Sequence, residues 1–354
     1  MNYLDKLRQS AKITGSIACM GLDPVISAMP LKHGNVRKIP FFIKDLFEEM
    51  ARQGEYPGLA KPNQGFYVRH NITEDKNSES FEGDKALARV VRTWKNMFEE
   101  IPICLDYKRG DIAKSSENYA AEGFEAWNAD SVTVAPYMGY DSVLPFAGRN
   151  PKDLEQAARY CNDEDGKGVY VLCRTSNDGA KDFQDLMVIS DLEKFCDELG
   201  EKRAGCIVYA SEERGLMGKL VKESSCIIPL YMAVVHKIID WARDNPGIGA
   251  VVGANYLKEL DEIARLIVSS GVDVPLLIPG AGKKSEGGQG GDASEVVAVL
   301  REAGYPLELA RINSSSGITH PWAKGGGKAP DDYAKVSVEK LAKLNELINY
   351  KPAA

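Results

Sequence analysis

Two carboxylates and an ammonium group lie close together in the stretch CLDYKRGDIAKSS, residues 104–116, where Asp106, Lys108 and Asp111 follow a short apolar run. Side chains two positions apart on a strand share one face, so we expect Asp106 and Lys108 to meet. Asp111 follows a glycine, and we expect it to lie where it can cap the next helix and still be close enough to hold Lys108. An ammonium group between two carboxylates stays protonated and fixed in direction, which suits a proton donor.

The elements that must position these residues are short apolar runs rich in β-branched residues. We expect strands at 16–23, 58–63, 101–108, 130–137, 168–176, 248–254, 275–282 and 309–317. We expect helices at 41–53, 84–99, 115–128, 151–160, 229–243, 257–270, 292–303 and 332–348. Runs that are apolar on both faces are typical of parallel strands covered by helices. The pattern favours an α/β protein with a (β/α)8 TIM barrel, and periodicity alone leaves a doubly wound sheet open.

The chain is interpreted as a single barrel domain over residues 1–354. The interval 178–228 is too long for a simple strand and helix unit, so we interpret it as an insertion after strand five. Residues 321–354 are interpreted as a C-terminal extension that contains the last helix.

Nearly every expected strand ends in polar or glycine residues. These residues are Asp23, Lys61 with Asn63, Asp106 with Lys108, Thr175 with Ser176, Gly280 with Gly282, and Ser314 to Ser316. One such residue alone is more often a helix cap or half of an ion pair. The carboxyl ends of barrel strands carry the chemistry of this fold, so their convergence there indicates an enzyme.

Composition argues against several other classes of protein. A net charge of −7 gives no basic surface for nucleic acid or an anionic membrane. No apolar run is long enough to span a bilayer, and the amphipathic amino terminus lacks a signal-peptide core, so we expect a cytoplasmic protein. The seven cysteines form no CxxC pair and the four histidines no HExxH motif, so we expect neither a disulfide framework nor a zinc site.

The residues also indicate how catalysis would work. The sequence shows no Ser-His-Asp set, metal cluster or dinucleotide fingerprint, so catalysis must depend on charge placement and on binding energy from a remote group. The glycine-rich stretch PGAGKKSEGGQGGD, residues 279–292, can present backbone N–H groups to a phosphate. The alternative interpretation of this stretch is a flexible connection.

Several motifs together match a known family. They are GLDP (21–24), KPNQGFY (61–67), DxKxxDI (106–112), VTVAPYMGYDS (132–142), CRTSN (173–177), DFQDL (182–186) and PGAG…QGGD (279–292). In this order, over about residues 15–320, they resemble orotidine 5'-monophosphate decarboxylase, in the longer subfamily of that enzyme. The resemblance implies a cofactor-free (β/α)8 barrel, active as a homodimer with shared sites, that converts orotidine monophosphate to uridine monophosphate in pyrimidine biosynthesis.

The resemblance also implies residue roles. Asp106 would press on the carboxylate that leaves, and Lys108 would protonate C6 of the pyrimidine. Lys61 would complete the charged array and bind ribose, while Asp111 would reach the partner subunit's site. Asp23 and Ser115 would contact ribose hydroxyls, Ser176 the pyrimidine edge, and Gln289 the phosphate and base. The implied substrate-binding set is Asp23, Ser115, Ser176, Gly280, Gly282, Gln289, Gly290 and Ser316.

One departure concerns the phosphate. Where the family has S-R-G-I after strand eight, with an Arg that grips the phosphate, this chain has Ser316 in the Arg position. The glycine-rich loop also carries extra residues, 283–288. Another cation should therefore replace the Arg. We favour Lys283 and Lys284 over the other candidates, which are His320, Lys324 and Lys328.

Two other functions remain as alternatives. One is a related barrel lyase that acts on a sugar phosphate with Mg²⁺. The other is a nucleotide-binding protein that has lost turnover, which the retention of Lys61, Asp106, Lys108 and Asp111 disfavours.

Overall fold

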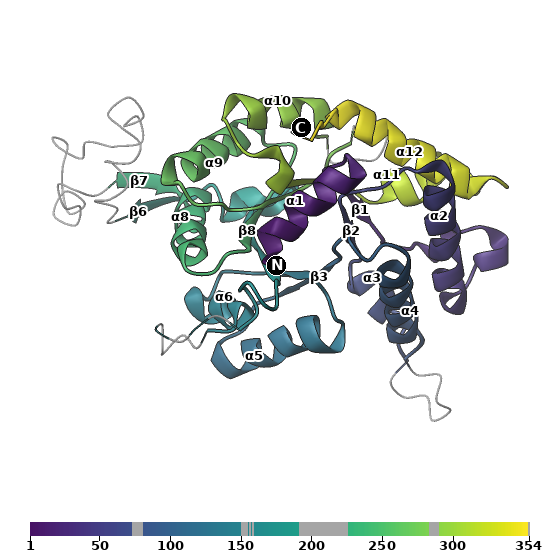
Figure 1. Ribbon diagram of the computed structural model, residues 1–354, viewed down its shortest axis with the longest axis horizontal. Helices are drawn as coiled ribbons and strands as arrows, with labels where there is room; N and C mark the ends of the chain where they lie inside the picture. The colour runs from purple at the N-terminus through teal and green to yellow at the C-terminus, as the bar shows by residue number, and fades with distance from the viewer. Residues whose placement is uncertain are drawn as a thin grey trace.

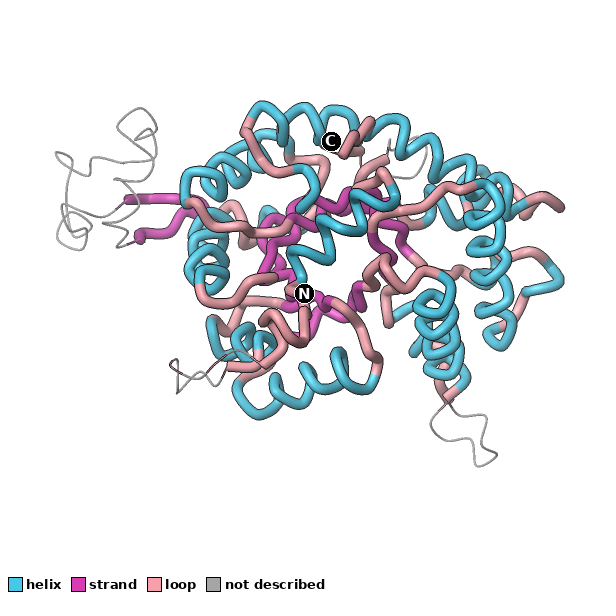
Figure 2. The backbone as a smooth tube through the Cα atoms, in the orientation of Figure 1, coloured by secondary structure: helices cyan, strands magenta, loops and turns pink. Residues whose placement is uncertain are grey.

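The computed structural model describes residues 1–72, 81–149, 155, 157, 159–190, 226–282 and 290–352. Eight parallel strands form one sheet in the order β2-β1-β10-β9-β8-β5-β4-β3. Single bridges from Ala60 to Ile103 and from Asn63 to Asp106 join the two edge strands. The sheet therefore closes nearly into a barrel, with the helices around it (Figures 1 and 2), and the predicted (β/α)8 fold is confirmed.

Each barrel strand overlaps one of the apolar runs in the sequence. The strands are β1 (Ala18–Gly21), β2 (Leu59–Lys61), β3 (Cys104–Arg109), β4 (Ser131–Val134), β5 (Gly168–Arg174), β8 (Ile248–Val252), β9 (Leu276–Pro279) and β10 (Ala310–Ser314). Strands β1, β2, β4 and β8 are buried at every position. This burial on both faces explains why their sequences do not alternate between apolar and polar residues.

Most of the expected helices are present, with ends shifted by a few residues. The helices are α1 (Tyr3–Thr14), α2 (Ile39–Gln53), α3 (Gly65–Val68), α4 (Glu82–Met97), α5 (Ala113–Ala121), α6 (Tyr140–Ala147), α8 (Leu230–Arg243), α9 (Leu257–Ser270), α10 (Ala293–Glu302), α11 (Ser316–Thr319) and α12 (Tyr333–Ile348). A π-helical turn, η4 (Glu122–Ala126), continues α5.

The sequence patterns did not predict the helices α1, α3, α6 and α11. The segment between β4 and β5 forms its helix at α6, whereas the helix expected over 151–160 lies largely outside the described residues. Residues 155, 157, 159 and 160 of that range are described, and they are not helical. Helix α6 contains Pro145, and a proline in a helix interior normally signals a break, which concealed this helix in the sequence.

Between β5 and α8 the chain forms the 3-10 helix η5 (Asp178–Asp182) and an antiparallel pair of strands, β6 (Met187–Ser190) and β7 (Cys226–Pro229). The pair projects beside α8, away from the barrel strands (Figure 1). The interpretation of residues 178–228 as an insertion stays a prediction, because residues 191–225 lie outside the described part of the chain.

The C-terminal helix α12 packs against α2 and α10. At its first residue, the Tyr333 hydroxyl hydrogen-bonds to the Asp45 carboxylate of α2. The same carboxylate lies 2.9 Å from Nε2 of His33. These contacts hold the last helix on the side of the barrel.

Helix α1 closes the amino-terminal end of the barrel and lies across the strands in Figure 1. The Tyr3 hydroxyl donates to Ser131 Oγ at 2.8 Å, inside the base of the barrel. Arg311 of β10 is fully buried, and its guanidinium donates to the Leu7 carbonyl at 2.6 Å and the Gly58 carbonyl at 3.2 Å. The buried guanidinium of Arg311 therefore joins α1 to the sheet through hydrogen bonds.

Replacing Arg311 should destabilise the barrel strongly. Arg311→Met leaves buried carbonyl oxygens without donors, so we expect the free energy of unfolding to fall by about 3 kcal/mol. Arg265→Met is a matched control because Arg265 is half-buried and pairs with Asp261 on the same helix. Urea unfolding of both variants measures the difference, and equal losses would show that Arg311 has no special role.

Candidate active site

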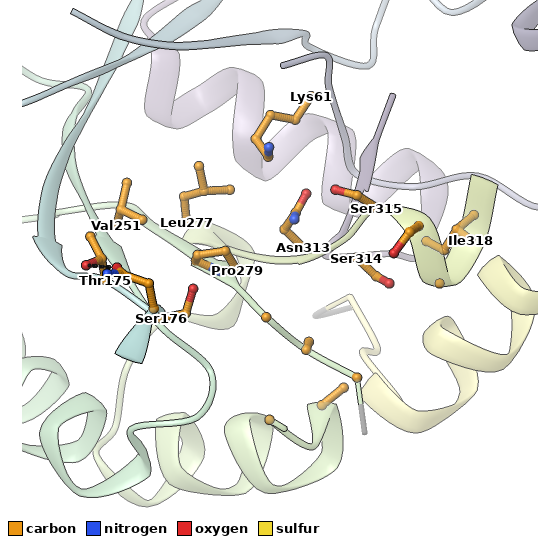
Figure 3. A pocket seen from close by; sticks show the side chains of 18 of the residues that line it. Lys61, Thr175, Ser176, Val251, Leu277, Pro279, Asn313, Ser314, Ser315 and Ile318 are labelled. Carbon is orange, nitrogen blue, oxygen red and sulfur yellow. Dashed lines mark hydrogen bonds between the residues drawn. The ribbon is translucent and has the colours of Figure 1, made fainter. Parts of the chain in front are cut away.

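A cavity of about 1250 Å³ opens at the carboxyl ends of the barrel strands. It is lined by residues from β2, β3, β5, β9 and the segment after β10, and Figure 3 shows Lys61, Ser176 and Ser315 around this space. The predicted site residues that line it are Lys61, Asp106, Lys108, Ser176, Gly280, Gly282 and Ser316. Side chains that are distant in the sequence are thus brought to one cavity.

The Asp106 carboxylate lies between two ammonium groups. Lys61 Nζ is 2.7 Å from one oxygen, and Lys108 Nζ is 2.5 Å from the other. Burial alone would raise the pKa of Asp106, but the two lysines outweigh it and hold that pKa well below its usual range. Burial would lower the pKa of Lys61, but Asp106 and Asp23 raise it above its usual range. Asp106 and Lys61 therefore stay charged at neutral pH.

The backbone turns sharply to bring Lys108 back to Asp106. Lys108 has φ of 47°, in the left-handed region that residues other than glycine seldom adopt. The register between β3 and β4 shifts at this point. Thr133 of β4 accepts the N–H groups of Tyr107 and Lys108, at 3.1 and 3.0 Å, and donates to Asp106 at 2.9 Å. Thr133 thus fixes the strained turn, and the sequence analysis did not identify it.

Asp23 supports the charged array from the end of β1. Its carboxylate accepts the Asn63 N–H at 3.0 Å and hydrogen-bonds to Ser315. Burial raises the pKa of Asp23, and Lys61 offsets part of that rise. Gly21 permits this arrangement because a Cβ there would lie only 1.9 Å from Ser315 Oγ.

Asp111 and Ser115 lie apart from the cavity of their own chain. Asp111 accepts the N–H of Ile112 at 2.7 Å, and helix α5 begins without a side-chain cap. Within the described residues, no ion pair joins Asp111 to Lys108. Both local roles considered for Asp111, the helix cap and the Lys108 partner, are therefore wrong. Ser115 is exposed on α5.

The glycine-rich loop is described only at its two ends. The Gly290 N–H donates to the Gly282 carbonyl at 3.0 Å, and the Gly282 N–H donates to the Gly291 carbonyl at 2.7 Å. The two ends are therefore joined. Gln289 and the lysine pair Lys283 and Lys284 lie outside the described residues.

The structure separates the other candidate cations near Ser316. Lys324 lines the same cavity as Ser316. His320 is buried, its Nδ1 lies 2.8 Å from Thr319 Oγ1, and burial together with Lys324 lowers its pKa to about 4. His320 is thus neutral at pH 7. Lys328 is exposed and does not line the cavity.

Asn313 of β10 is a second residue that the sequence analysis missed. Its side chain points into the cavity in Figure 3, and it is 6% exposed. Its Oδ1 atom has no hydrogen-bond partner within the described part of the chain. A buried acceptor in this position is suited to a donor group of a ligand. A polar side chain two residues after the buried Arg311, in the strand LARINS, was the available signal.

Among the described residues, no group of three or more His, Cys, Asp and Glu side chains is arranged to hold a metal ion. The helices in this part of the chain include none that is long and apolar enough to cross a membrane.

Comparisons with known proteins agree on one family. A family model described as "Orotidine 5'-phosphate decarboxylase / HUMPS family" matches residues 45–231. A curated orotidine 5'-phosphate decarboxylase of Variovorax paradoxus is 30% identical over 346 residues, which cover 95% of this chain and 94% of the relative.

Solved structures give the same result. The OMP decarboxylase of Leishmania donovani has 26% identity and a TM-score of 0.61, with all of both chains covered. The UMP synthase of the same organism has 28% identity and a TM-score of 0.63, and this chain spans 58% of its length. The family match over more than half of the sequence, and the 30% identity over nearly all of it, show that this chain belongs to the orotidine 5'-phosphate decarboxylase / HUMPS family.

Proposed function

We propose that this protein is a carboxy-lyase that converts orotidine 5'-monophosphate to uridine 5'-monophosphate in the cytoplasm. The observation that carries the proposal is the buried carboxylate of Asp106, kept ionised between Lys61 and Lys108 at the cavity wall. The names of the relatives and the family description support the same substrate. The charged array suits a reaction that removes one carboxylate and needs one proton.

In the proposed mechanism, the substrate's carboxylate lies next to Asp106 and is repelled by it. The bond from C6 to that carboxylate breaks, carbon dioxide leaves, and the electron pair stays on C6. Lys108 then transfers a proton from Nζ to C6 and recovers one from solvent. The repulsion disappears as carbon dioxide forms, while the attraction of Lys108 for the developing charge increases. The array therefore stabilises the transition state more than the substrate.

The remaining predicted residues would hold the nucleotide. Asp23 and Lys61 would bind ribose, and Ser176 the edge of the pyrimidine. Gly280, Gly282 and Gly290 would present the loop that carries Gln289, and Ser316 would lie near the phosphate. This assignment follows the family resemblance, and the common cavity of Lys61, Ser176 and Ser316 supports it.

A homodimer with shared sites is also part of the proposal. Asp111 and Ser115 lie outside the cavity of their own chain, so a partner subunit is needed for them to contact the substrate. Large apolar side chains are exposed after β3 and β4, with Ile112 51%, Tyr137 89% and Met138 51% exposed. An apolar surface of this kind is suited to a second copy of the chain.

The reaction can be tested by the fall in ultraviolet absorbance when the purified protein meets orotidine monophosphate. We expect turnover both with and without a chelator. A requirement for metal, seen as loss of turnover with chelator, would instead favour the related lyase that acts on a sugar phosphate with Mg²⁺. Binding without any turnover would favour a nucleotide-binding protein.

Replacing the central carboxylate should separate binding from catalysis. Asp106→Asn removes the repulsion on the substrate's carboxylate, so uridine monophosphate should bind as well or more tightly while kcat falls about 100-fold or more. Steady-state kinetics and product titration measure the two effects. Turnover within a few-fold of the wild type would show that Asp106 does not have this role.

Subunit mixing tests the shared site. Lys108→Ala and Asp111→Ala chains should each be inactive, but their heterodimer would contain one intact site. Random mixing should therefore restore about a quarter of wild-type activity. No recovery from heterodimers verified by mass spectrometry would place Asp111 in the site of its own subunit.

Lys324 is our proposed phosphate cation among the described residues, because it lines the cavity with Ser316. Lys324→Ala should raise KM about tenfold, and Ser316→Arg in that background should restore part of the loss. Lys328→Ala is the control and should change little. An unchanged KM for Lys324→Ala would exclude it and leave the loop pair Lys283 and Lys284, to be tested by their double Ala variant, and the cavity lysines of α12, Lys340 and Lys343.

The pH dependence tests His320 separately. A histidine that binds phosphate as a cation would weaken binding as pH rises through its pKa. Because the pKa of His320 is lowered to about 4, it is already neutral above about pH 6. His320→Gln should therefore leave the dependence of KM on pH unchanged between about pH 6 and 8. A changed profile would show that His320 is charged in the complex.

A further inference from the structure

Gln184 holds the segment that carries Ser176. Its side-chain oxygen accepts the Thr175 N–H at 2.8 Å, and its side-chain nitrogen donates to Thr175 Oγ1 at 2.8 Å. One amide thus binds the N–H and the hydroxyl of Thr175, the residue directly before Ser176. Gln184 belongs to the DFQDL motif, which the proposed mechanism does not use, and it also lines the cavity.

The orientation of this amide is fixed by Arg174. The buried Arg174 guanidinium donates to Gln184 Oε1 at 3.3 Å and pairs with Asp185 at 3.1 Å. It also stacks on the Tyr256 ring, 3.7 Å from the centroid. With Arg174 and the Thr175 N–H both directed at one amide atom, that atom must be the oxygen. The nitrogen is therefore the donor to Thr175.

Two further contacts fix Ser176 from the side of β8. The Asn255 side chain donates to the Ser176 carbonyl at 3.1 Å. Gly253 lies so close that a Cβ there would be 2.8 Å from the Ser176 Cα. On its other side, the segment is held by Gln184, a side chain from the part of the chain that follows η5.

Gln184 also lies where the strand pair β6 and β7 joins the barrel. The Tyr231 N–H donates to the Gln184 carbonyl at 3.1 Å, and the Leu230 N–H donates to the Leu186 carbonyl at 2.8 Å. Strand β6 starts at the next residue, Met187. A movement of the strand pair β6 and β7 would therefore be transmitted through the backbone to Gln184.

We propose that Gln184 is a positioning residue for Ser176, and that it sets the affinity of the site for the pyrimidine base. This inference rests on the proposed function, in which Ser176 contacts the base. The Gln184 amide contacts Thr175, the neighbour of Ser176. Asp23 and Lys61, which would bind the ribose, lie elsewhere, at the ends of β1 and β2. Gln184 should therefore affect binding of the base and not binding of the ribose phosphate.

Calorimetric titration with two ligands tests this role. Uridine monophosphate carries the base, and ribose 5-phosphate lacks it. Gln184→Met keeps the size of the side chain but loses both hydrogen bonds, so it should weaken uridine monophosphate binding about tenfold and leave ribose 5-phosphate binding within about twofold. Gln184→Glu keeps the acceptor and should restore part of the loss. Lys181→Ala, at an exposed position of η5, is the control.

A double-mutant cycle distinguishes positioning from independent action. Ser176→Ala should itself weaken uridine monophosphate binding, and Gln184→Met should then add little, because the hydroxyl that it positions is absent. Additive losses would overturn the inference, as would equal weakening of both ligands. Retained ribose 5-phosphate binding verifies that each variant is folded.

The same titrations separate this inference from the proposed reaction. Wild-type protein that binds uridine monophosphate but leaves orotidine monophosphate unchanged would refute the reaction, and the two-ligand comparison would still decide the role of Gln184. Wild-type protein that binds both ligands equally would have no base subsite, and the inference would be wrong.

Discussion

The ion pair between Lys61 and Asp106 joins β2 to β3, the two strands between which only isolated β-bridges close the barrel. Strands β2 and β3 are the two edges of the sheet, and they meet through Ala60 with Ile103 and Asn63 with Asp106. The 2.7 Å contact from Lys61 to Asp106 crosses this seam. A buried carboxylate that lost its partner would be strongly destabilising, so the charge pair and the closure of the barrel depend on each other.

Backbone strain occurs at the carboxyl end of the barrel, and stabilising buried hydrogen bonds occur at its amino end. At the carboxyl ends, Lys108 has a left-handed backbone that Thr133 holds in place, and such strain is characteristic of functional sites. At the amino ends, Tyr3 and Arg311 join α1 to the sheet through buried hydrogen bonds. The rigid base compensates for the strain at the carboxyl end, and Lys108 is held on a strand and not on a loop.

The sequence was most informative where its signals are local. Parallel strands are buried on both faces, so their apolar runs could be identified directly, and the spacing of Asp106 and Lys108 placed them together. Thr133 was missed because its role depends on a register shift between β3 and β4, which no local pattern encodes. Helix α6 was missed because Pro145 normally ends a helix. The sequence of one chain does not encode which residues meet across a subunit interface, so the role of Asp111 in a partner's site stays a prediction.

In the proposed mechanism, the phosphate end of the substrate must supply much of the binding energy. Asp106 would repel the carboxylate that the reaction removes, so binding at that end would be opposed before catalysis begins. An enzyme can offset such repulsion only with binding energy from parts of the substrate that do not react. Ser316 provides a hydroxyl where the family provides a guanidinium, and the buried His320 is neutral. The proposed compensating cation is therefore a lysine. Lys324, in the 3-10 helix η10 (Pro321–Gly325), lines the cavity with Ser316, as do Lys340 and Lys343 of α12. Because a lysine lacks the planar fork of an arginine, phosphate recognition here would depend more on charge than on geometry.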